Sequence, residues 1–396
     1  MPTTTKARAS WLPFIILYVS YMSLYFVRYN FSVTSALMES GGVLTKAQIG
    51  FIGSSFALVY AIVKIPAGFL GDRCPTRWII FTGLMLTAVS NLLISRMLSF
   101  VPIAVLWGVN SAGQALMWGP VLRALSETYE SQRSRVLQQY FITCTSVGMI
   151  VGLLAATYLS ERWSVPTCFL LAGLIPLAMA CLVLAVFRRR NGGAAVVHHQ
   201  TVRESVMVLW KSSEFRTNMF PAITNGLIKD NLNVWLVIYF MDQFGADLQA
   251  MSGFMLFVPL MIFIGKIIFP PLNRWLRSEV RVSILCFVVA IAALVPLVFG
   301  TDSPAVAMIC LGITAAMTSA INTHLLIPPP SYAENGNIAL CASLMDTLVY
   351  GGAGIGSLFF GLMIARWGYG SMFLTWAAAC AISLAIFTVS EHRKTK

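Results

Sequence analysis

The sequence predicts an all-α membrane protein with twelve transmembrane helices in two pseudo-symmetric six-helix bundles. Hydrophobic residues make up 58% of the 396-residue chain and charged residues only 11%, whereas a soluble domain carries about 25% charged residues. The apolar residues gather in runs close to the length of about 20 residues that a helix needs to cross a bilayer. In addition, the sequence around Arg28 in the first run is repeated around Lys229, about half a chain later.

Twelve apolar runs are the candidate membrane spans. They lie near residues 11–33, 47–70, 78–96, 101–122, 137–159, 165–187, 217–241, 251–270, 281–300, 303–327, 336–362 and 370–390. We expect an N-terminal six-helix bundle at residues 1–187, a cytoplasmic linker at 188–216, which opens with three arginines, and a C-terminal six-helix bundle at 217–396. Two parallel repeats of this kind place a binding site near the midplane of the membrane.

The net charge of +12 reflects membrane topology rather than nucleic-acid binding. Most of the 27 Lys and Arg residues fall in the termini and in the even-numbered loops between the expected spans. Because cytoplasmic loops carry an excess of Lys and Arg, this bias places both termini in the cytoplasm. The chain leads into its first span with no sign of a cleavable signal peptide. We expect a multi-pass membrane protein, with a bacterial inner membrane as the favoured location.

Cysteine and histidine give no indication of a metal site or a cofactor. The eight cysteines are scattered singly, mostly within spans, where Cys behaves as a small apolar residue. The adjacent pair His198-His199 in the linker cannot alone fill a coordination sphere. No nucleophile–base pair stands out, and no extramembrane segment is long enough for a catalytic domain. The sequence therefore argues against an enzyme.

Arg28 and Lys229 each carry a charge inside an apolar run. A lone charge at bilayer depth costs roughly 2.5 kcal/mol or more, so such residues usually have a functional reason. Their surroundings repeat, because residues 28–33 (Arg-Tyr-Asn-Phe-Ser-Val) align with residues 229–234 (Lys-Asp-Asn-Leu-Asn-Val). A duplicated membrane protein with one cation in each half predicts a two-fold-related site for an anion. We therefore expect a transporter of a small anionic substrate.

The segment after the second run carries a spaced set of glycine, acidic and basic residues. Gly68, Asp72, Arg73 and Arg77 follow the pattern G-x-x-x-D-R-x-x-x-R, which resembles the signature of the major facilitator superfamily. The resemblance implies gating residues: the glycine permits a close helix approach, while Asp and Arg latch neighbouring helix ends at the cytoplasmic face. The alternative is the ordinary positive charge of a cytoplasmic loop. The matching loop of the second half has Asn-Arg instead of Asp-Arg, so we expect a weaker or differently built gate there.

Three segments of the first half resemble the organophosphate:phosphate antiporter family, whose members exchange glycerol 3-phosphate or hexose 6-phosphate for inorganic phosphate. They are Tyr21–Phe31 (Tyr-x-x-x-Tyr-x-x-Arg-x-Asn-Phe), Tyr60–Lys64 (Tyr-x-x-x-Lys) and Gly113–Arg123 (Gly-x-x-x-x-Trp-x-Pro-x-x-Arg). The resemblance implies secondary active transport of a phosphate ester by alternating access, in exchange for phosphate. Lys229 stands at the position of a substrate-binding Arg, and Thr145 at that of a frequent His. The family therefore supports an anionic substrate more firmly than a particular sugar phosphate.

Seven residues are candidates for substrate binding. They are Arg28, Lys229, Tyr25, Tyr21, Tyr60, Lys64 and Trp118. Tyr21, Tyr25 and Arg28 are spaced i, i+4, i+7 and share one helical face, and the same holds for Tyr60 and Lys64. A guanidinium offers a fork of donors and an ammonium a compact charge, and both form short, strong hydrogen bonds to phosphate or carboxylate. The alternatives are that the cations snorkel to the membrane interface and that the aromatic residues only pack or belong to an interfacial belt.

Asp346, Asp230 and His324 are candidates for coupling or charge balance. A proton-coupled carrier needs a carboxylate or His that is protonated in one access state and deprotonated in the other. Asp346 precedes the glycine-rich stretch 351–356 and is a candidate partner for Lys229 when substrate is absent; the alternative is a helix–helix hydrogen bond.

Two other functions remain open. One is proton-coupled transport of another organic anion (a carboxylate, a phosphonate or a lipid-like anion), and the other is a membrane sensor that keeps a transporter fold. The expected partners are a small anionic substrate, the lipid bilayer and either phosphate or a proton as coupling ion. We expect no nucleic acid as a partner and a functional monomer.

Overall fold

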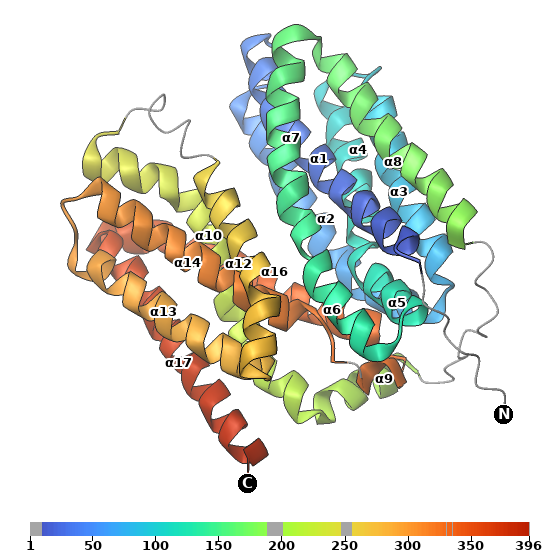
Figure 1. Ribbon diagram of the computed structural model, residues 1–396. Coiled ribbons are helices and arrows are strands. Elements are labelled where there is room, and N and C mark those ends of the chain that lie inside the picture. Colours follow the sequence, from blue (N-terminus) through green and yellow to red (C-terminus); the bar gives the residue numbers. More distant parts are fainter. Residues whose placement is uncertain (1–9, 188–200, 247–255, 330, 335, 396) are drawn as a thin grey trace, which may run out of the picture. The chain divides into compact units, whose positions relative to one another are not determined.

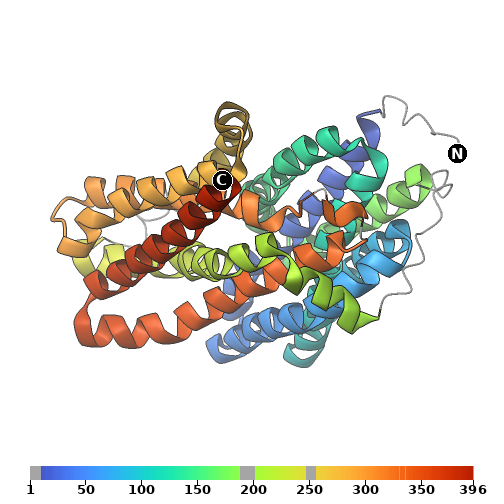
Figure 2. The same cartoon turned by 90° about the horizontal axis from the view of Figure 1, so that it is seen from below.

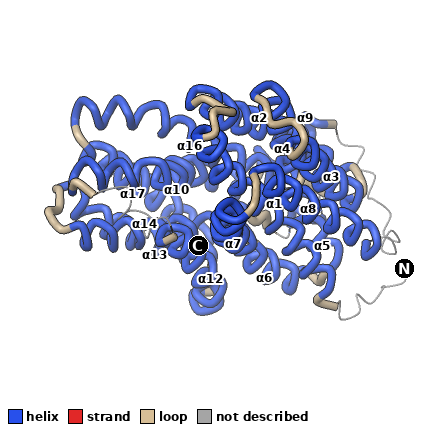
Figure 3. Tube along the Cα trace, turned by 90° about the horizontal axis from the view of Figure 1, so that it is seen from above, coloured by secondary structure: helices blue, strands red, loops and turns tan. Residues whose placement is uncertain are grey.

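The computed structural model describes residues 10–187, 201–246, 256–329, 331–334 and 336–395, and the regular elements in these ranges are all helices (Figures 1 and 3). The long helices of the first half are α1 (Leu12–Ser40), α2 (Lys46–Arg73), α3 (Thr76–Ile94), α4 (Phe100–Ala115), α7 (Thr143–Arg162) and α8 (Val165–Phe187), with the short α5 (Trp118–Thr128) and α6 (Ser131–Phe141) between them. They are followed by α9 (Val202–Lys211), α10 (Ser213–Phe244), α12 (Phe257–Leu276), α13 (Glu279–Phe299), α14 (Pro304–Leu326), α15 (Ser331–Glu334), α16 (Ile338–Trp367) and α17 (Tyr369–Thr395).

Eleven helical stretches in the described ranges are long and apolar enough to cross a membrane. They match eleven of the twelve predicted spans. The seventh span is covered by α10, which has 32 residues but is less apolar because Lys229 and Asp230 lie in its middle. The fourth and fifth spans are each built from two helices, since the chain breaks at Leu116–Met117 and again at Ile142. Residues 251–255 of the predicted eighth span lie outside the described residues.

The chain forms two compact units. The first contains residues 1–205 and 328–344, and the second contains residues 206–327 and 345–396. The predicted boundaries at 187 and 217 stay predictions, and linker residues 188–200 lie outside the described ranges. The two units are not simply the two halves of the sequence, because the start of α16 is grouped with the first unit.

Within the first unit, α1 packs against α7 and α8, α3 against α8 and α4, and α2 against α4. Aromatic side chains fill its core: the rings of Phe31 and Trp107 are 4.6 Å apart, and Trp107 also contacts Phe56 and Phe169. This packing brings one face of α1 toward α2 and α4, which carry the remaining candidate residues of the first half.

Within the second unit, α10 packs against α14 and α17, and α13 packs against the same two helices (Figures 1 and 2). The contact between α10 and α16 is made by two glycines. A Cβ atom at Gly226 would collide with the carbonyl of Val349, and one at Gly352 would collide with the carbonyl of Ile223. Because small residues let helix backbones approach closely in membranes, this reciprocal contact fixes the position of α10 next to α16.

We predict that Gly352→Ala destabilises the second unit, whereas Gly351→Ala does not. The added methyl group at Gly352 meets a backbone carbonyl that cannot move without separating the helices, a cost of about 1–3 kcal/mol. A Cβ at Gly351 meets nothing within 4 Å. Thermal unfolding of the purified variants in the same detergent checks the difference, and equal midpoints would contradict the tight α10–α16 contact.

Candidate functional site

Arg28 of α1 contacts an amide side chain and three aromatic rings. Its Nε and Nη2 donate to Oε1 of Gln114 at 3.0 and 2.9 Å. Its Cζ lies 4.9 Å from the ring centre of Tyr25 and 5.2 Å from those of Phe56 and Tyr60. Cations placed over aromatic faces are attracted by the ring quadrupole without being neutralised. Tyr25 and Arg28, which were predicted to share one face of the helix, are therefore in contact.

Lys64 and Tyr60 form a second buried contact on α2. Lys64 is fully buried, and its Nζ donates to the Tyr60 hydroxyl at 2.9 Å. The ammonium also lies 4.7 Å from the centre of the same ring. Because Tyr60 contacts both Arg28 and Lys64, it links the two cations. We refer to Tyr25, Arg28, Tyr60, Lys64 and Gln114 as the cationic cluster.

Tyr21 and Trp118 lie deeper in the first unit. Both are buried, their rings are 5.3 Å apart, and each packs on Phe141. The centre of the Tyr21 ring is 5.9 Å from that of Tyr25, so Tyr21 and Trp118 pack next to the cationic cluster. The buried indole nitrogen of Trp118 has no hydrogen-bond partner among the described residues. Their contacts are those of packing residues, and their contact with substrate stays a prediction.

In the second unit, Lys229 and Asp230 form a salt bridge with 2.6 Å between Nζ and Oδ1. Neighbouring helical positions face about 100° apart, so the lysine chain turns back to reach the carboxylate. The other oxygen of Asp230 is buried and has no hydrogen-bond partner in the described part of the chain. Next to this pair, Asn231 donates to the carbonyl of Ala353 on α16 at 3.1 Å. The α10–α16 contact therefore extends to the Lys229–Asp230 pair.

Asp346 and His324 are both buried. The Lys229–Asp346 pairing expected in the absence of substrate stays a prediction. The Nδ1 atom of His324 on α14 is 2.8 Å from the Ser283 hydroxyl on α13, and its ring lies 5.4 Å from that of Phe387 on α17. These partners place the imidazole among α13, α14 and α17.

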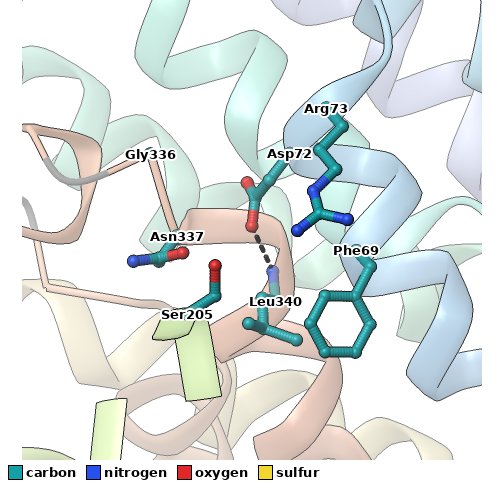
Figure 4. A pocket seen from close by; sticks show the side chains of 7 residues that line it. All are labelled: Phe69, Asp72, Arg73, Ser205, Gly336, Asn337 and Leu340. Carbon is teal, nitrogen blue, oxygen red and sulfur yellow. Dashed lines mark hydrogen bonds between the residues drawn. The ribbon is translucent and has the colours of Figure 1, made fainter. Parts of the chain in front are cut away.

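The signature residues hold the start of α16. The two carboxylate oxygens of Asp72 accept hydrogen bonds from the backbone N–H groups of Ala339 and Leu340, each at 2.8 Å. Figure 4 shows the Leu340 contact, with Arg73 and Phe69 alongside. A carboxylate at this end of a helix satisfies orphan N–H groups and interacts favourably with the helix dipole.

Small residues make this contact possible. A Cβ at Gly68 would lie 2.8 Å from the Cβ of Ser343, so only glycine allows α2 to approach α16 this closely. Arg73 and Arg77 lie over the rings of Phe69 and Trp78. A small pocket adjoins the contact; it is lined by Phe69, Asp72, Arg73, Ser205, Gly336, Asn337 and Leu340.

Two residues of the site were not predicted from the sequence. Gln114 accepts hydrogen bonds from Arg28. Arg123 donates to the backbone carbonyls of Gly71 at 2.7 Å and of Cys74 at 3.1 Å. It also forms a salt bridge with Glu127 at 2.7 Å. Both lie in the Gly113–Arg123 segment. The i, i+4 spacing of Asn110 and Gln114, two amides in an apolar run, was the available signal. In the described ranges, no three His, Cys, Asp or Glu side chains are grouped so that they could hold a metal ion.

The apolar helices define a multi-pass membrane protein. The sequence matches the Major Facilitator Superfamily over residues 17–327. The chain belongs to this family, as its signature residues predicted. The expectation that the chain is not an enzyme is confirmed by the family and by the relatives, which are transporters and membrane sensors.

Several curated relatives are named for the transport of phosphorylated compounds, and one is named as a membrane sensor. The "Probable hexose phosphate transport protein" of Chlamydia muridarum is 30% identical over 136 residues, which are 34% of this chain and 30% of that protein. The "Membrane sensor protein UhpC" of Escherichia coli is 30% identical over 122 residues, which are 31% of this chain and 27% of that protein. A glycerol-3-phosphate transporter of Bacillus subtilis is 22% identical over 180 residues, which are 44% of this chain and 40% of that protein. The chain thus spans well under half of the length of these relatives.

Solved structures show the same fold. The fucose:proton symporter FucP of Escherichia coli matches with a TM-score of 0.77 at 17% identity, over 96% of this chain and 99% of that chain. The human organic anion transporter MFSD10 matches with a TM-score of 0.72 at 12% identity, over 98% of this chain and 100% of that chain. These identities bear on the fold alone, and the predicted major facilitator fold is confirmed.

We predict that Asp72→Asn loosens the first turn of α16. An amide retains one acceptor but turns an NH2 group toward one of the two N–H groups, and hydrogen bonds to a charged group contribute about 1.5–3 kcal/mol. Hydrogen exchange followed by mass spectrometry, with the protein in lipid nanodiscs, should show faster exchange at Ala339 and Leu340. The exposed Asp302→Asn provides the control, and unchanged exchange in Asp72→Asn would contradict this role.

Proposed function

We propose that this protein is a secondary active transporter of a small organic anion, with phosphate esters favoured, working by alternating access in exchange for inorganic phosphate. The observation that carries the proposal is the cationic cluster. It holds a guanidinium and an ammonium inside apolar helices by means of an amide oxygen, a phenol hydroxyl and aromatic rings. The proposed location is a bacterial inner membrane, with both termini in the cytoplasm, and the proposed active form is a monomer.

The charge of a phosphate ester suits this cluster. A phosphate monoester carries about −1.5 to −2 charges at pH 7 and three strong acceptor oxygens. Arg28 can bind two of these oxygens through a fork of donors, while Lys64 adds a compact charge. The names of the hexose phosphate and glycerol-3-phosphate relatives support the same substrate class. A carboxylate or a phosphonate would satisfy the same donors and stays the alternative.

Lys229 is proposed as a further substrate-binding cation that exchanges its partner. It is paired with Asp230 at 2.6 Å, so a phosphate that binds Lys229 competes with this carboxylate. Such an exchange makes the binding of substrate depend on the conformation of α10. A ligand can shift a conformational equilibrium only by its different affinity for the two states, and the exchange provides that difference. Release of Asp72 from the start of α16 is proposed as the gating step of the same cycle.

Phosphate exchange in proteoliposomes tests the proposal. Vesicles loaded with labelled phosphate should release it when a phosphate ester is added outside. We predict that Arg28→Ala lowers this exchange by at least about 100-fold and Arg28→Lys by about tenfold, because Lys retains the charge but not the fork. The exposed Arg162→Ala is the matched control and should behave as the wild type. Folded wild-type protein that exchanges no phosphate compound would overturn the proposal.

We predict that Asp230→Asn raises the apparent affinity for phosphate several-fold and slows turnover. The neutral amide no longer competes for Lys229, so phosphate binds more tightly and leaves more slowly. Initial rates of exchange over a range of phosphate concentrations separate KM from kcat. The control is Asp242→Asn on the same helix, which removes an exposed carboxylate that binds the hydroxyl of Tyr369. An unchanged or higher KM in Asp230→Asn would contradict the competition.

A membrane sensor is the second candidate function, favoured by the likeness to the sensor UhpC. The same vesicles distinguish it from a transporter. Arg28-dependent thermal stabilisation by a phosphate ester, with no flux under any gradient, would support a sensor. Uptake that needs a proton gradient but no internal phosphate would support proton coupling, for which Asp346 and His324 are the candidate residues.

A further inference from the structure

Helix α9, which precedes α10, lies at the level of a membrane boundary. Its Ser205 is buried and lines the small pocket next to the end of α2, together with Phe69, Asp72 and Arg73 (Figure 4). The stretch of α2 that is apolar enough to cross a membrane ends at Arg73. Because Ser205 is beside this last turn, α9 lies where the bilayer meets water rather than far out in solution.

The beginning of α9 is fixed by its own side chains. The N–H of Thr201 donates to Oε2 of Glu204 at 2.6 Å, and the N–H of Glu204 donates to Oγ1 of Thr201 at 3.3 Å. This reciprocal pair is a capping box, which satisfies two N–H groups at a helix start. With 10 residues, α9 is nevertheless shorter than the roughly 12–15 residues that a helix needs to be even marginally stable alone in water. Its stability must therefore come from docking.

An apolar stripe runs along α9 on a different face from its buried residues. Ser205 and Leu209, one turn apart, are buried. The apolar stripe consists of Val206, Met207 and Trp210, which are 38%, 41% and 53% exposed and whose i, i+1, i+4 spacing places them on one side of the helix. Trp is enriched in the headgroup region of membranes, where one end of the ring is in an apolar and the other in a wet environment. The apolar stripe therefore fits the surface of a bilayer.

Basic residues lie at both ends of the apolar stripe. Arg203 is one turn before Met207 and Lys211 is one turn after it, and both are exposed. This spacing keeps the two cations on the side of the helix that carries the stripe, where their stems can cover apolar surface while their charges reach lipid phosphates. The neighbouring acidic residue, Glu204, is engaged at the helix start. The membrane side that is predicted to be cytoplasmic carries anionic lipids, which attract basic residues.

We propose that α9 binds the surface of an anionic bilayer as a helix lying in the membrane plane. The apolar stripe enters the boundary between headgroups and acyl chains, while Arg203 and Lys211 bind the phosphates of anionic lipids. Amphipathic helices bind membranes through buried apolar area combined with attraction to anionic lipid. Because Ser205 on the buried face lines the pocket next to Asp72, this docking also holds α9 beside the Asp72 contact. The role is independent of the transported substrate.

Hydroxyl-radical footprinting tests the proposal on the whole chain, because Met207 and Trp210 carry readily oxidised side chains. The protein is compared in nanodiscs of phosphatidylcholine alone and of phosphatidylcholine mixed with phosphatidylglycerol. We expect oxidation of both residues to be at least about threefold slower in the anionic discs, and high salt to remove most of this difference by screening. Equal rates in the two kinds of disc would overturn the proposal, whether both are high, as for a stripe in water, or low, as for a stripe covered by protein.

Removal of the two charges tests headgroup binding. In anionic discs, the double variant Arg203→Gln/Lys211→Gln should be oxidised as fast as the wild type is in neutral discs. Both side chains are exposed, so the substitutions are compatible with the fold. The matched control is Arg96→Gln/Arg162→Gln, which removes two exposed basic residues from loops predicted on the opposite side of the membrane. Protection that persists in the first double variant would contradict the role of the two cations.

Trp210→Ala tests the apolar part of the contact. Hydrogen exchange of the amides in residues 201–211, measured by mass spectrometry in anionic discs, should become several-fold faster, because a helix this short depends on docking. Trp163→Ala changes a tryptophan of similar exposure, 52%, and should leave exchange in α9 as in the wild type. Exchange that is unaffected by Trp210→Ala would contradict insertion of the apolar stripe into the bilayer.

Discussion

The placement of positive charges within apolar helices is the constraint on which the described site depends. Each cation must be compensated inside the protein, because an unpaired charge at this depth is costly. The two units do this differently. Arg28 and Lys64 contact an amide, a phenol and aromatic rings, whereas Lys229 forms a salt bridge with the next residue along its helix. The described contacts of the first two cations are thus with neutral groups, and that of the third is with a carboxylate.

The unpaired polar groups of a helix terminus impose a similar constraint at the start of α16. Its first N–H groups require acceptors, and a carboxylate from a segment more than 260 positions earlier in the chain provides two. The contact depends on the absence of a side chain at Gly68, and the α10–α16 contact depends in the same way on Gly226 and Gly352. Glycines therefore decide where α16 lies at both of these points, and both points carry charged residues close by.

Much of this arrangement could be predicted from the sequence, because it depends on local periodicity. Apolar runs located the helices, and i, i+4 spacing placed Tyr60 beside Lys64, where the hydrogen bond is found. Contacts between segments far apart could not be derived in this way. The Arg28–Gln114 contact joins residues 86 positions apart, and the breaks within the fourth and fifth spans carry no proline or glycine at the break itself. The turn of Lys229 toward Asp230 depends on the rotamers of a long side chain, which helical spacing does not fix.

The different partners of the cations have a consequence for the proposed cycle. A phosphate that binds Arg28 competes with the neutral amide of Gln114. A phosphate that binds Lys229 competes with the charged carboxylate of Asp230. Because coupling between binding and conformation is reciprocal, the state that separates Lys229 from Asp230 is also the state that binds phosphate most tightly. A dianionic phosphate ester competes with the Asp230 carboxylate for Lys229 more strongly than a monoanion such as a simple carboxylate does, and in the proposed cycle this difference favours phosphate esters.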